Sequence, residues 1–176
     1  IAEALKEQNA NSLAEGYYKK AIEDGSREIQ TEARFLLGEC QRKLGMVNDA
    51  RYSYASVEAG SPYTLQALRR LVEIDLSQRN YEGVLTWVSE GRESYPGEFK
   101  EGWVSYAYVS ALTELGRNDE ARKELQDFRN RRSEKDPWYT LAEAMVEARL
   151  VSALILGAVL NDAPASAVGS QDQSKS

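Results

Sequence analysis

Apolar residues recur at intervals of three and four positions along most of the chain, the spacing that places them on one face of an α-helix. Glycine, proline, serine and charged residues interrupt this pattern at Gly25-Ser26, Gly60-Ser61-Pro62, Pro96-Gly97 and Ser133-Glu134-Lys135. Such interruptions are typical of helix ends and loops. The pattern predicts helices over 1–8, 12–24, 28–44, 47–59, 63–78, 81–94, 98–115, 118–131 and 137–160. No stretch shows the alternation of a β-hairpin, so the sequence predicts an all-α fold.

The segment 31–62 contains small residues and an aromatic at positions that suit two helices packed as a pair. Gly38 allows the two helices to approach closely, and Gly45 is placed to end the first helix with a positive φ. Ala50 is a small contact that faces the first helix, and Tyr54 fills the groove between the helices. Pro62 is expected to stop the second helix.

The same pattern returns along the chain, which indicates internal repeats. The second copy lies about 34 residues on, and the third is displaced by a further 37. The matching residues are Leu71, Val84, Val88 and Pro96 in the second copy, and Leu115, Gly116, Ala121 and Leu125 in the third. Asn80 is expected to end a helix in the second copy.

Both ends of the chain carry partial copies of the unit. Ala14, Tyr18 and Ala21 have the spacing of a second helix, so 1–8 is expected to be the remainder of a first helix. Trp138 and Leu141 open a further unit, with Asp136 as the predicted N-cap residue and Pro137 as the first helical residue.

This pattern resembles the tetratricopeptide repeat (TPR) family, whose unit places Leu-Gly, Gly, Ala and Pro at fixed offsets within about 34 residues. The chain departs from the family at Arg34, Gln41, Val72 and Val109. The resemblance implies a right-handed α-solenoid of antiparallel helix pairs over 1–161. Its units lie near 1–28, 31–64, 65–98 and 102–134, followed by a capping helix over 137–160 and a flexible tail over 162–176. A helical bundle whose period arose by chance is the alternative.

In TPR proteins the first helix of each unit lines a concave groove that receives ligands. Carried onto this chain, the resemblance implies a groove formed by Phe35, Glu39, Arg42, Arg69, Arg70, Glu73, Trp103, Tyr106 and Tyr139. The four aromatics could anchor a partner's side chains or could pack against neighbouring helices. The arginines could receive carboxylates of a peptide, but pairing with Glu39 and Glu73 on a solvated face is the favoured reading.

The end of the last predicted helix, from Leu150 to Leu160, is apolar on nearly all sides. Such a helix is usually buried on several sides, so we expect Leu150, Leu154 and Ile155 to pack against a second copy of the chain or a partner. The apolar run is well short of the roughly 20 residues that span a bilayer, and no membrane span is expected.

Composition narrows the possible chemistry. The 176 residues include no histidine and one cysteine, Cys40, and carry a net charge of -6. Histidine-based catalysis, histidine zinc sites and internal disulfides are therefore excluded, and Cys40 is expected to be a buried small residue. The acidic balance argues against nucleic acid as a partner. The basic run over 122–135 is interpreted as a solvated helix end, with a phosphate-binding or RNA-binding patch as the alternative.

These observations predict a non-catalytic scaffold, with no cofactor and no metal, that binds a partner protein or peptide in its groove. A self-assembling structural repeat protein is one alternative, and a helical regulatory domain of an enzyme or sensor is another. The TPR resemblance implies a setting such as bacterial complex assembly, and the compartment stays open between cytoplasm and periplasm.

Overall fold

The computed structural model describes residues 2–131 and 136–161, and within them every regular element is a helix. The eight helices are α1 (Ala2–Asp24), α2 (Arg27–Lys43), α3 (Val47–Ala55), α4 (Thr64–Ser77), α5 (Tyr81–Ser94), α6 (Gly102–Glu114), α7 (Asn118–Arg131) and α8 (Pro137–Asn161). The expected all-α class is therefore confirmed. The predicted tail over 162–176 and the loop over 132–135 lie outside the described residues.

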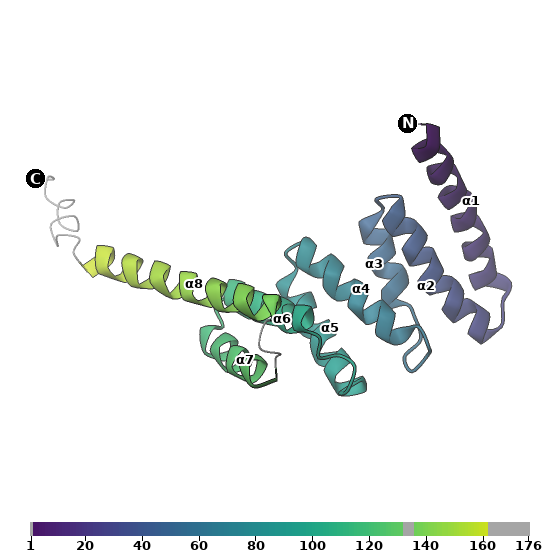
Figure 1. Cartoon of the computed structure of the whole chain (residues 1–176). Coiled ribbons are helices and arrows are strands. Elements are labelled where there is room, and N and C mark those ends of the chain that lie inside the picture. The colour runs from purple at the N-terminus through teal and green to yellow at the C-terminus, as the bar shows by residue number, and fades with distance from the viewer. Residues whose placement is uncertain (1, 132–135, 162–176) are drawn as a thin grey trace, which may run out of the picture.

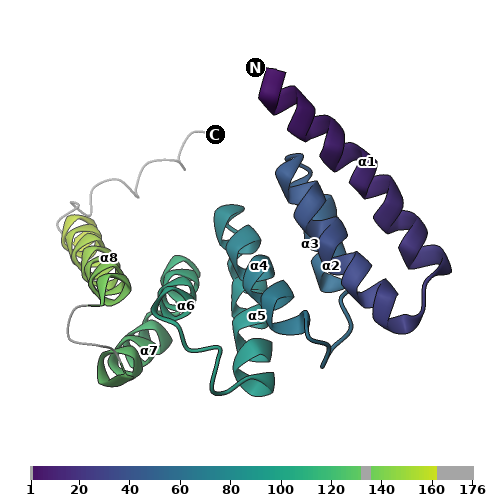
Figure 2. The ribbon, with the colours of Figure 1, turned by 45° about the vertical axis from the view of Figure 1, so that its right-hand side comes forward.

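The helices follow one another along an open arc, with α1 at one end and α8 at the other (Figure 2). Each helix packs against the next one in the chain, and α6 packs in addition against α4 and α8. In Figure 2, α4 and α6 lie on the inner side of the arc, and α5 and α7 lie on the outer side. The second half of α8 extends past α6 and α7 (Figure 1).

Three turns between paired helices share one backbone conformation. Gly45, Arg79 and Gly116 have φ values of 75°, 58° and 74°. After each of them, the next residue donates its N–H to a carbonyl five positions back: Met46 to Gln41, Asn80 to Asp75 and Arg117 to Leu112, each at 2.8 Å. This is the bonding of a Schellman helix end, and it occurs at the intervals that the sequence repeats predict.

The middle turn corrects the assignment of Asn80 as the residue that ends a helix. Arg79 takes the left-handed conformation there, and Asn80 instead caps the start of α5, because its side chain accepts a bond from the N–H of Gly83. The prediction was wrong because asparagine is favoured both after the end of a helix and as the N-cap residue of the next one.

The packing of α2 on α3 agrees with the roles predicted for Gly38, Ala50 and Tyr54. A Cβ at Gly38 would lie 2.7 Å from Cε1 of Tyr54, so only glycine leaves room for the ring. Ala50 and Tyr54 are 0% and 1% exposed. They belong to a core cluster shared by α2, α3 and α4, and a larger cluster runs from α4 to α8. Trp87 packs against both clusters.

The two predicted helices 1–8 and 12–24 are one continuous helix, α1. The residues expected between them, Asn9, Ala10 and Asn11, include no glycine or proline. Asparagine lowers helix propensity by only a fraction of a kcal/mol, about 0.7 or less, which does not break a helix that packs along α2.

Two other helix ends differ from the prediction. The helix expected over 47–59 ends at Ala55, so Pro62 does not stop it and lies two residues before α4. The helix expected from 98 begins at Gly102. Phe99 is fully buried beside Gly91, and the chain turns inward to place this ring before α6 begins.

Candidate partner-binding groove

A groove lies where α4, α6 and α8 meet. Leu76, Trp103, Tyr106 and Trp138 form most of its lining, with Glu73 and Ser77 completing it, and its volume is about 480 Å³. The Tyr106 and Trp138 rings are tilted against each other with centroids 5.4 Å apart. Trp138 is 40% exposed, whereas Trp103 and Tyr106 are partly buried against the larger core cluster. The three rings therefore leave a partly exposed aromatic surface for a binding partner.

The start of α8 is fixed in a way that holds Trp138 in the groove. Oδ1 of Asp136 accepts bonds from the N–H groups of Trp138 at 2.9 Å and Tyr139 at 3.4 Å, and Pro137 is the first helical residue. The capping role predicted for Asp136 is confirmed. A Cβ at Gly102 would lie 2.7 Å from Oδ2 of Asp136, so this glycine allows the starts of α6 and α8 to lie close together.

The structure places two of the four predicted groove aromatics, Trp103 and Tyr106, in the groove. The prediction is wrong for Phe35, which is 8% exposed and packs against the rings of Tyr54 and Tyr63. It is also wrong for Tyr139, which is 5% exposed.

Tyr139 packs edge-on against Phe128 of α7, and its hydroxyl donates to Glu143 at 2.7 Å. The groove residue at this point of α8 is Trp138 and not the predicted Tyr139, whereas the sequence pattern indicates for Trp138 only that it opens a unit. Neighbouring residues of a helix point about 100° apart, so a small error in register selects the buried residue.

The predicted arginine cluster is paired with acidic residues of the chain itself. Arg70 donates to Glu39 at 2.8 Å and to Glu73 at 2.9 Å, and Arg42 donates to Glu39 at 3.1 Å. Arg69 pairs with Glu101. The favoured interpretation of this cluster, in which the arginines pair with acidic residues on a solvated face, therefore agrees with the structure.

Glu39 is the centre of this network. Burial by itself would raise the pKa of its carboxyl group, but hydrogen bonds from Tyr54, Arg42 and Arg70 outweigh burial and leave that pKa lowered. The Tyr54 hydroxyl donates to Glu39 at 2.7 Å. Burial, together with this bond, raises the pKa of Tyr54. The carboxylate thus joins α2, α3 and α4.

α4 also carries a buried carboxylate, Asp75, that could not be identified from the sequence. Asp75 is 0% exposed. Its oxygens accept bonds from Arg51 at 2.5 and 3.0 Å and from the Trp87 indole N–H at 2.7 Å. The Arg51 guanidinium also lies 5.9 Å from the Trp87 ring centroid. Because these three groups satisfy one another and come from α3, α4 and α5, their role is to hold the helices together.

The basic run near the end of α7 is partly neutralised. Arg131 donates to Glu124 at 2.8 Å, and Arg92 of α5 donates to the same carboxylate at 2.7 Å. Arg122 pairs with Asp119. These contacts agree with a solvated helix end. Arg132 and Lys135 lie outside the described residues.

The second half of α8 carries the predicted apolar surface. Leu150 packs against the larger core cluster. Val151, Leu154 and Ile155 are 55%, 74% and 58% exposed, and the side chains of 156–160 lie outside the described residues. Leu154 and Ile155 are thus available to another molecule, whereas Leu150 is partly buried against the core of its own chain.

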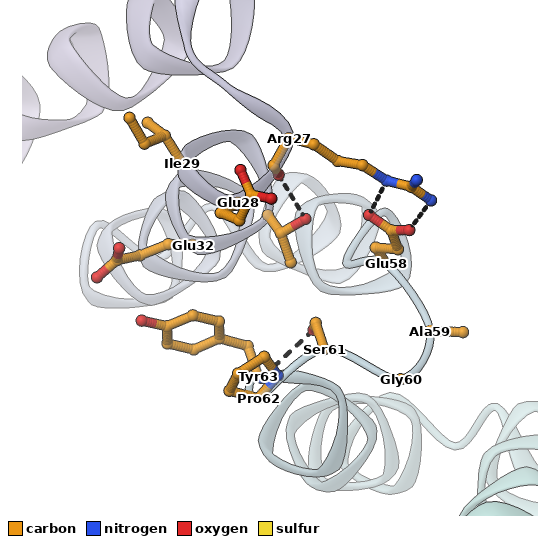
Figure 3. Close-up of a pocket in the computed structure, with 11 residues that line it drawn as sticks. Arg27, Glu28, Ile29, Glu32, Glu58, Ala59, Gly60, Ser61, Pro62 and Tyr63 are labelled. Carbon is orange, nitrogen blue, oxygen red and sulfur yellow. Dashed lines mark hydrogen bonds and ion pairs between the residues drawn. The ribbon is translucent and has the colours of Figure 1, made fainter.

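A second hollow of about 540 Å³ lies between the start of α2 and the α3–α4 connection (Figure 3). Arg27 and Glu58 face each other at one edge, with the Arg27 Nε 2.8 Å from Glu58 Oε2, and the hydrogen bond from Arg27 lowers the pKa of Glu58. The Tyr63 ring lies on the side of Glu32 (Figure 3). Because Arg27 and Glu58 satisfy each other, this hollow has less to offer a partner than the aromatic groove.

Among the described residues, no group of three or more acidic or cysteine side chains is placed to hold a metal ion. None of the helices in that part of the chain combines the length and apolar character needed to cross a bilayer. Cys40 is buried, as predicted, and burial raises the pKa of its thiol.

Comparison of the chain with protein-family models, curated proteins and solved structures finds no match. The resemblance to the TPR family therefore stays a prediction from the sequence of this chain.

Proposed function

We propose that this chain is a non-catalytic TPR-like scaffold that binds a partner protein or peptide in the groove between α4, α6 and α8. The observation that carries the proposal is the open aromatic lining of that groove, formed by Trp103, Tyr106 and Trp138. Tryptophan and tyrosine are enriched among the residues that contribute most to protein interfaces.

The family assignment is supported by repeated geometry rather than by any relative. The three turns at Gly45, Arg79 and Gly116 have the same conformation, and the Gly38–Tyr54 contact is of the kind the TPR unit needs. Successive helices contact each other, and α6 also contacts α4 and α8. This arrangement suits the right-handed solenoid that the family would imply.

The chemistry of the groove favours binding over catalysis. Glu73 and Tyr106 are its ionisable lining residues, and Glu73 is engaged by Arg70. Nucleophilic catalysis needs a nucleophile beside an activating base. Ser77 instead donates to the carbonyl of Ile74 at 2.7 Å within its own helix.

The test is capture of partners from the native extract with the parent chain and with Trp103→Ala plus Tyr106→Ala. We expect loss of a specific partner, because both rings line the groove. Tyr52→Ala is the matched control, since Tyr52 is an aromatic residue 76% exposed on α3, outside the groove. A folded double variant, checked by its thermal transition, that retains every partner would rule the groove out.

A second candidate function is self-assembly through α8, favoured by the exposed apolar side chains of Val151, Leu154 and Ile155. Exposed apolar surface of this kind often marks an interface. Light scattering of Leu154→Asp plus Ile155→Asp against the parent tests it, with Leu13→Asp on α1 as a control at a residue 68% exposed. A parent chain that is already monomeric would exclude self-assembly.

A further inference from the structure

We propose that the groove between α4, α6 and α8 receives a cationic side chain, lysine or arginine, from a basic segment of the partner. This inference rests on the proposed function and names the chemistry of the partner. Three aromatic rings and one carboxylate share the lining of the groove, and this combination can stabilise a desolvated positive charge.

The aromatic rings supply the first part of the recognition. Trp103, Tyr106 and Trp138 line one hollow, and the Tyr106 and Trp138 rings are 5.4 Å apart at 42°. The face of an aromatic ring is negative and attracts a cation placed over it, most strongly for tryptophan. Leu76 adds an apolar wall against which the alkyl stem of a lysine or arginine can pack.

Glu73 supplies the second part. Of the described residues that line the groove, Glu73 alone carries a formal charge, and its side chain is 47% exposed. Arg70 donates a hydrogen bond to Oε2 of Glu73 at 2.9 Å. The same guanidinium also donates to Glu39. A ligand cation would therefore share Glu73 with Arg70.

The surrounding charges favour a basic partner over an acidic one. Arg42, Arg69 and Arg70 are paired with Glu39, Glu101 and Glu73. Among the described residues, Glu73 lines the groove and none of these three arginines does. The chain as a whole has a net charge of -6, which attracts a basic segment over distance.

The experiment uses the three tryptophans as reporters in the full chain. Trp103 and Trp138 line the groove, whereas the Trp87 indole N–H is bound to Asp75. The indole N–H resonances, assigned by single Trp→Phe replacements, are followed during titration with a short synthetic peptide in which lysine alternates with serine. Matched peptides carry glutamate or leucine in place of lysine.

We expect saturable shifts of Trp103 and Trp138 with the lysine peptide, little change of Trp87, and much weaker responses to the other two peptides. Tyr106→Ala should weaken lysine-peptide binding by about tenfold. Glu73→Gln should weaken it by about threefold to fivefold. Glu93→Gln removes the same charge at an exposed position of α5 and should leave the affinity unchanged.

Arg70→Gln gives a change in the opposite direction. Without the guanidinium, Glu73 is free for the ligand, so lysine-peptide binding should tighten by about twofold to threefold. Loss of folding cannot explain weaker binding in Glu73→Gln together with tighter binding in Arg70→Gln.

Other results would overturn the inference in distinct ways. Preference for the leucine peptide would show that the groove receives apolar side chains. Preference for the glutamate peptide would show that it receives anionic rather than cationic side chains. Equal weakening by Glu73→Gln and Glu93→Gln would show unspecific attraction. If no peptide shifts the indole N–H resonances, a cationic ligand is excluded. The proposed function is tested separately, by whether Trp103→Ala plus Tyr106→Ala loses its partner.

Discussion

At the scale of single residues, equivalent positions of two repeat units carry side chains of different size, and in both units these side chains are part of the core. Gly38 and Tyr54 meet in the unit 31–64. The residues 34 positions later are Val72 and Val88, both fully buried in one core cluster. A very small residue beside a large one is thus replaced by two of intermediate size. Volume-conserving exchanges of this kind are the ones that cores tolerate best.

This exchange predicts strong coupling between positions 38 and 54. Gly38→Val should destabilise the protein by about 1–3 kcal/mol, because a Cβ there would lie 2.7 Å from the Tyr54 ring. Tyr54→Val should cost about 3 kcal/mol through the cavity that it leaves. The double variant should lose less than the sum by about 1–2 kcal/mol, as measured by urea unfolding.

Gly16→Ala is the control for this double-mutant cycle. No atom outside the helix lies within 4 Å of a Cβ at Gly16 of α1, so alanine should be neutral or stabilising by about 0.5–1 kcal/mol. Additive effects at positions 38 and 54 would contradict the proposed exchange of volumes.

At the scale of elements, the helices and most of their ends follow from periodicity and from glycine, proline and capping residues. Gly45, Asp136 and Pro137 could be assigned because each has a strong local preference. Two other features could not be predicted, because they depend on which helices meet in the fold. They are the burial of Phe99 and the pairing of Asp75 with Arg51 and Trp87. Helical spacing identifies the face of α6 that carries Trp103 and Tyr106, but it leaves open whether Trp138 or Tyr139 faces the same hollow.

Glycine at position 79, in the turn between α4 and α5, should raise the stability of the protein. Arg79 has a φ of 58°, a conformation that costs a side-chain-bearing residue about 1 kcal/mol, whereas glycine occupies the equivalent positions 45 and 116. Arg79→Gly should therefore stabilise the protein by about 0.5–1 kcal/mol, measured from the urea midpoint.

Arg79→Ala separates the backbone from the side chain at this turn. Alanine removes the guanidinium but keeps the cost of a positive φ, so it should not reproduce the gain. Gly116→Ala should lower stability by about 1 kcal/mol, because no atom lies within 4 Å of a Cβ there and strain is the only change. Stabilisation by Arg79→Ala equal to that by Arg79→Gly would mean that the side chain, and not the backbone, is unfavourable.

The link that Glu39 makes between α2, α3 and α4 should depend on pH. The pKa of Glu39 is lowered in the folded chain, so its contribution is present above the unfolded pKa of about 4.3 and is lost as the pH falls through the folded pKa. Glu39→Gln should cost about 1–2 kcal/mol near pH 7, and the difference from the parent should shrink below about pH 4.

Urea unfolding across this pH range measures the effect of Glu39→Gln. Glu93→Gln, which removes an exposed carboxylate of α5, serves as the control and should give a small difference from the parent. If the cost of Glu39→Gln were independent of pH, the network around Glu39 would contribute through shape rather than charge.

At the scale of the whole molecule, contacts between helices that are neighbours in the chain predict uneven stability. α1 contacts α2 as its main partner, whereas α6 contacts α4, α5, α7 and α8. The core is also divided into two clusters that share Trp87. In such an array each unit is stabilised mainly by its neighbours. We therefore expect amide hydrogens of α1 and of the second half of α8, which extends past α6 and α7 (Figure 1), to exchange fastest, and those of α4 to α6 to exchange slowest.

Two matched substitutions distinguish local from global unfolding in this array. Leu37 of α2 and Leu112 of α6 are 7% and 1% exposed, and each change to alanine should cost about 2–5 kcal/mol. Leu37→Ala should raise exchange mainly in α1 to α3, and Leu112→Ala mainly in α4 to α8, as read by hydrogen exchange and mass spectrometry. Equal acceleration of every helix by both variants would mean that the arc unfolds as one unit. In that case the Trp87 junction, with the Asp75–Arg51 pair beside it, would couple the two clusters as strongly as the helices within each cluster are coupled.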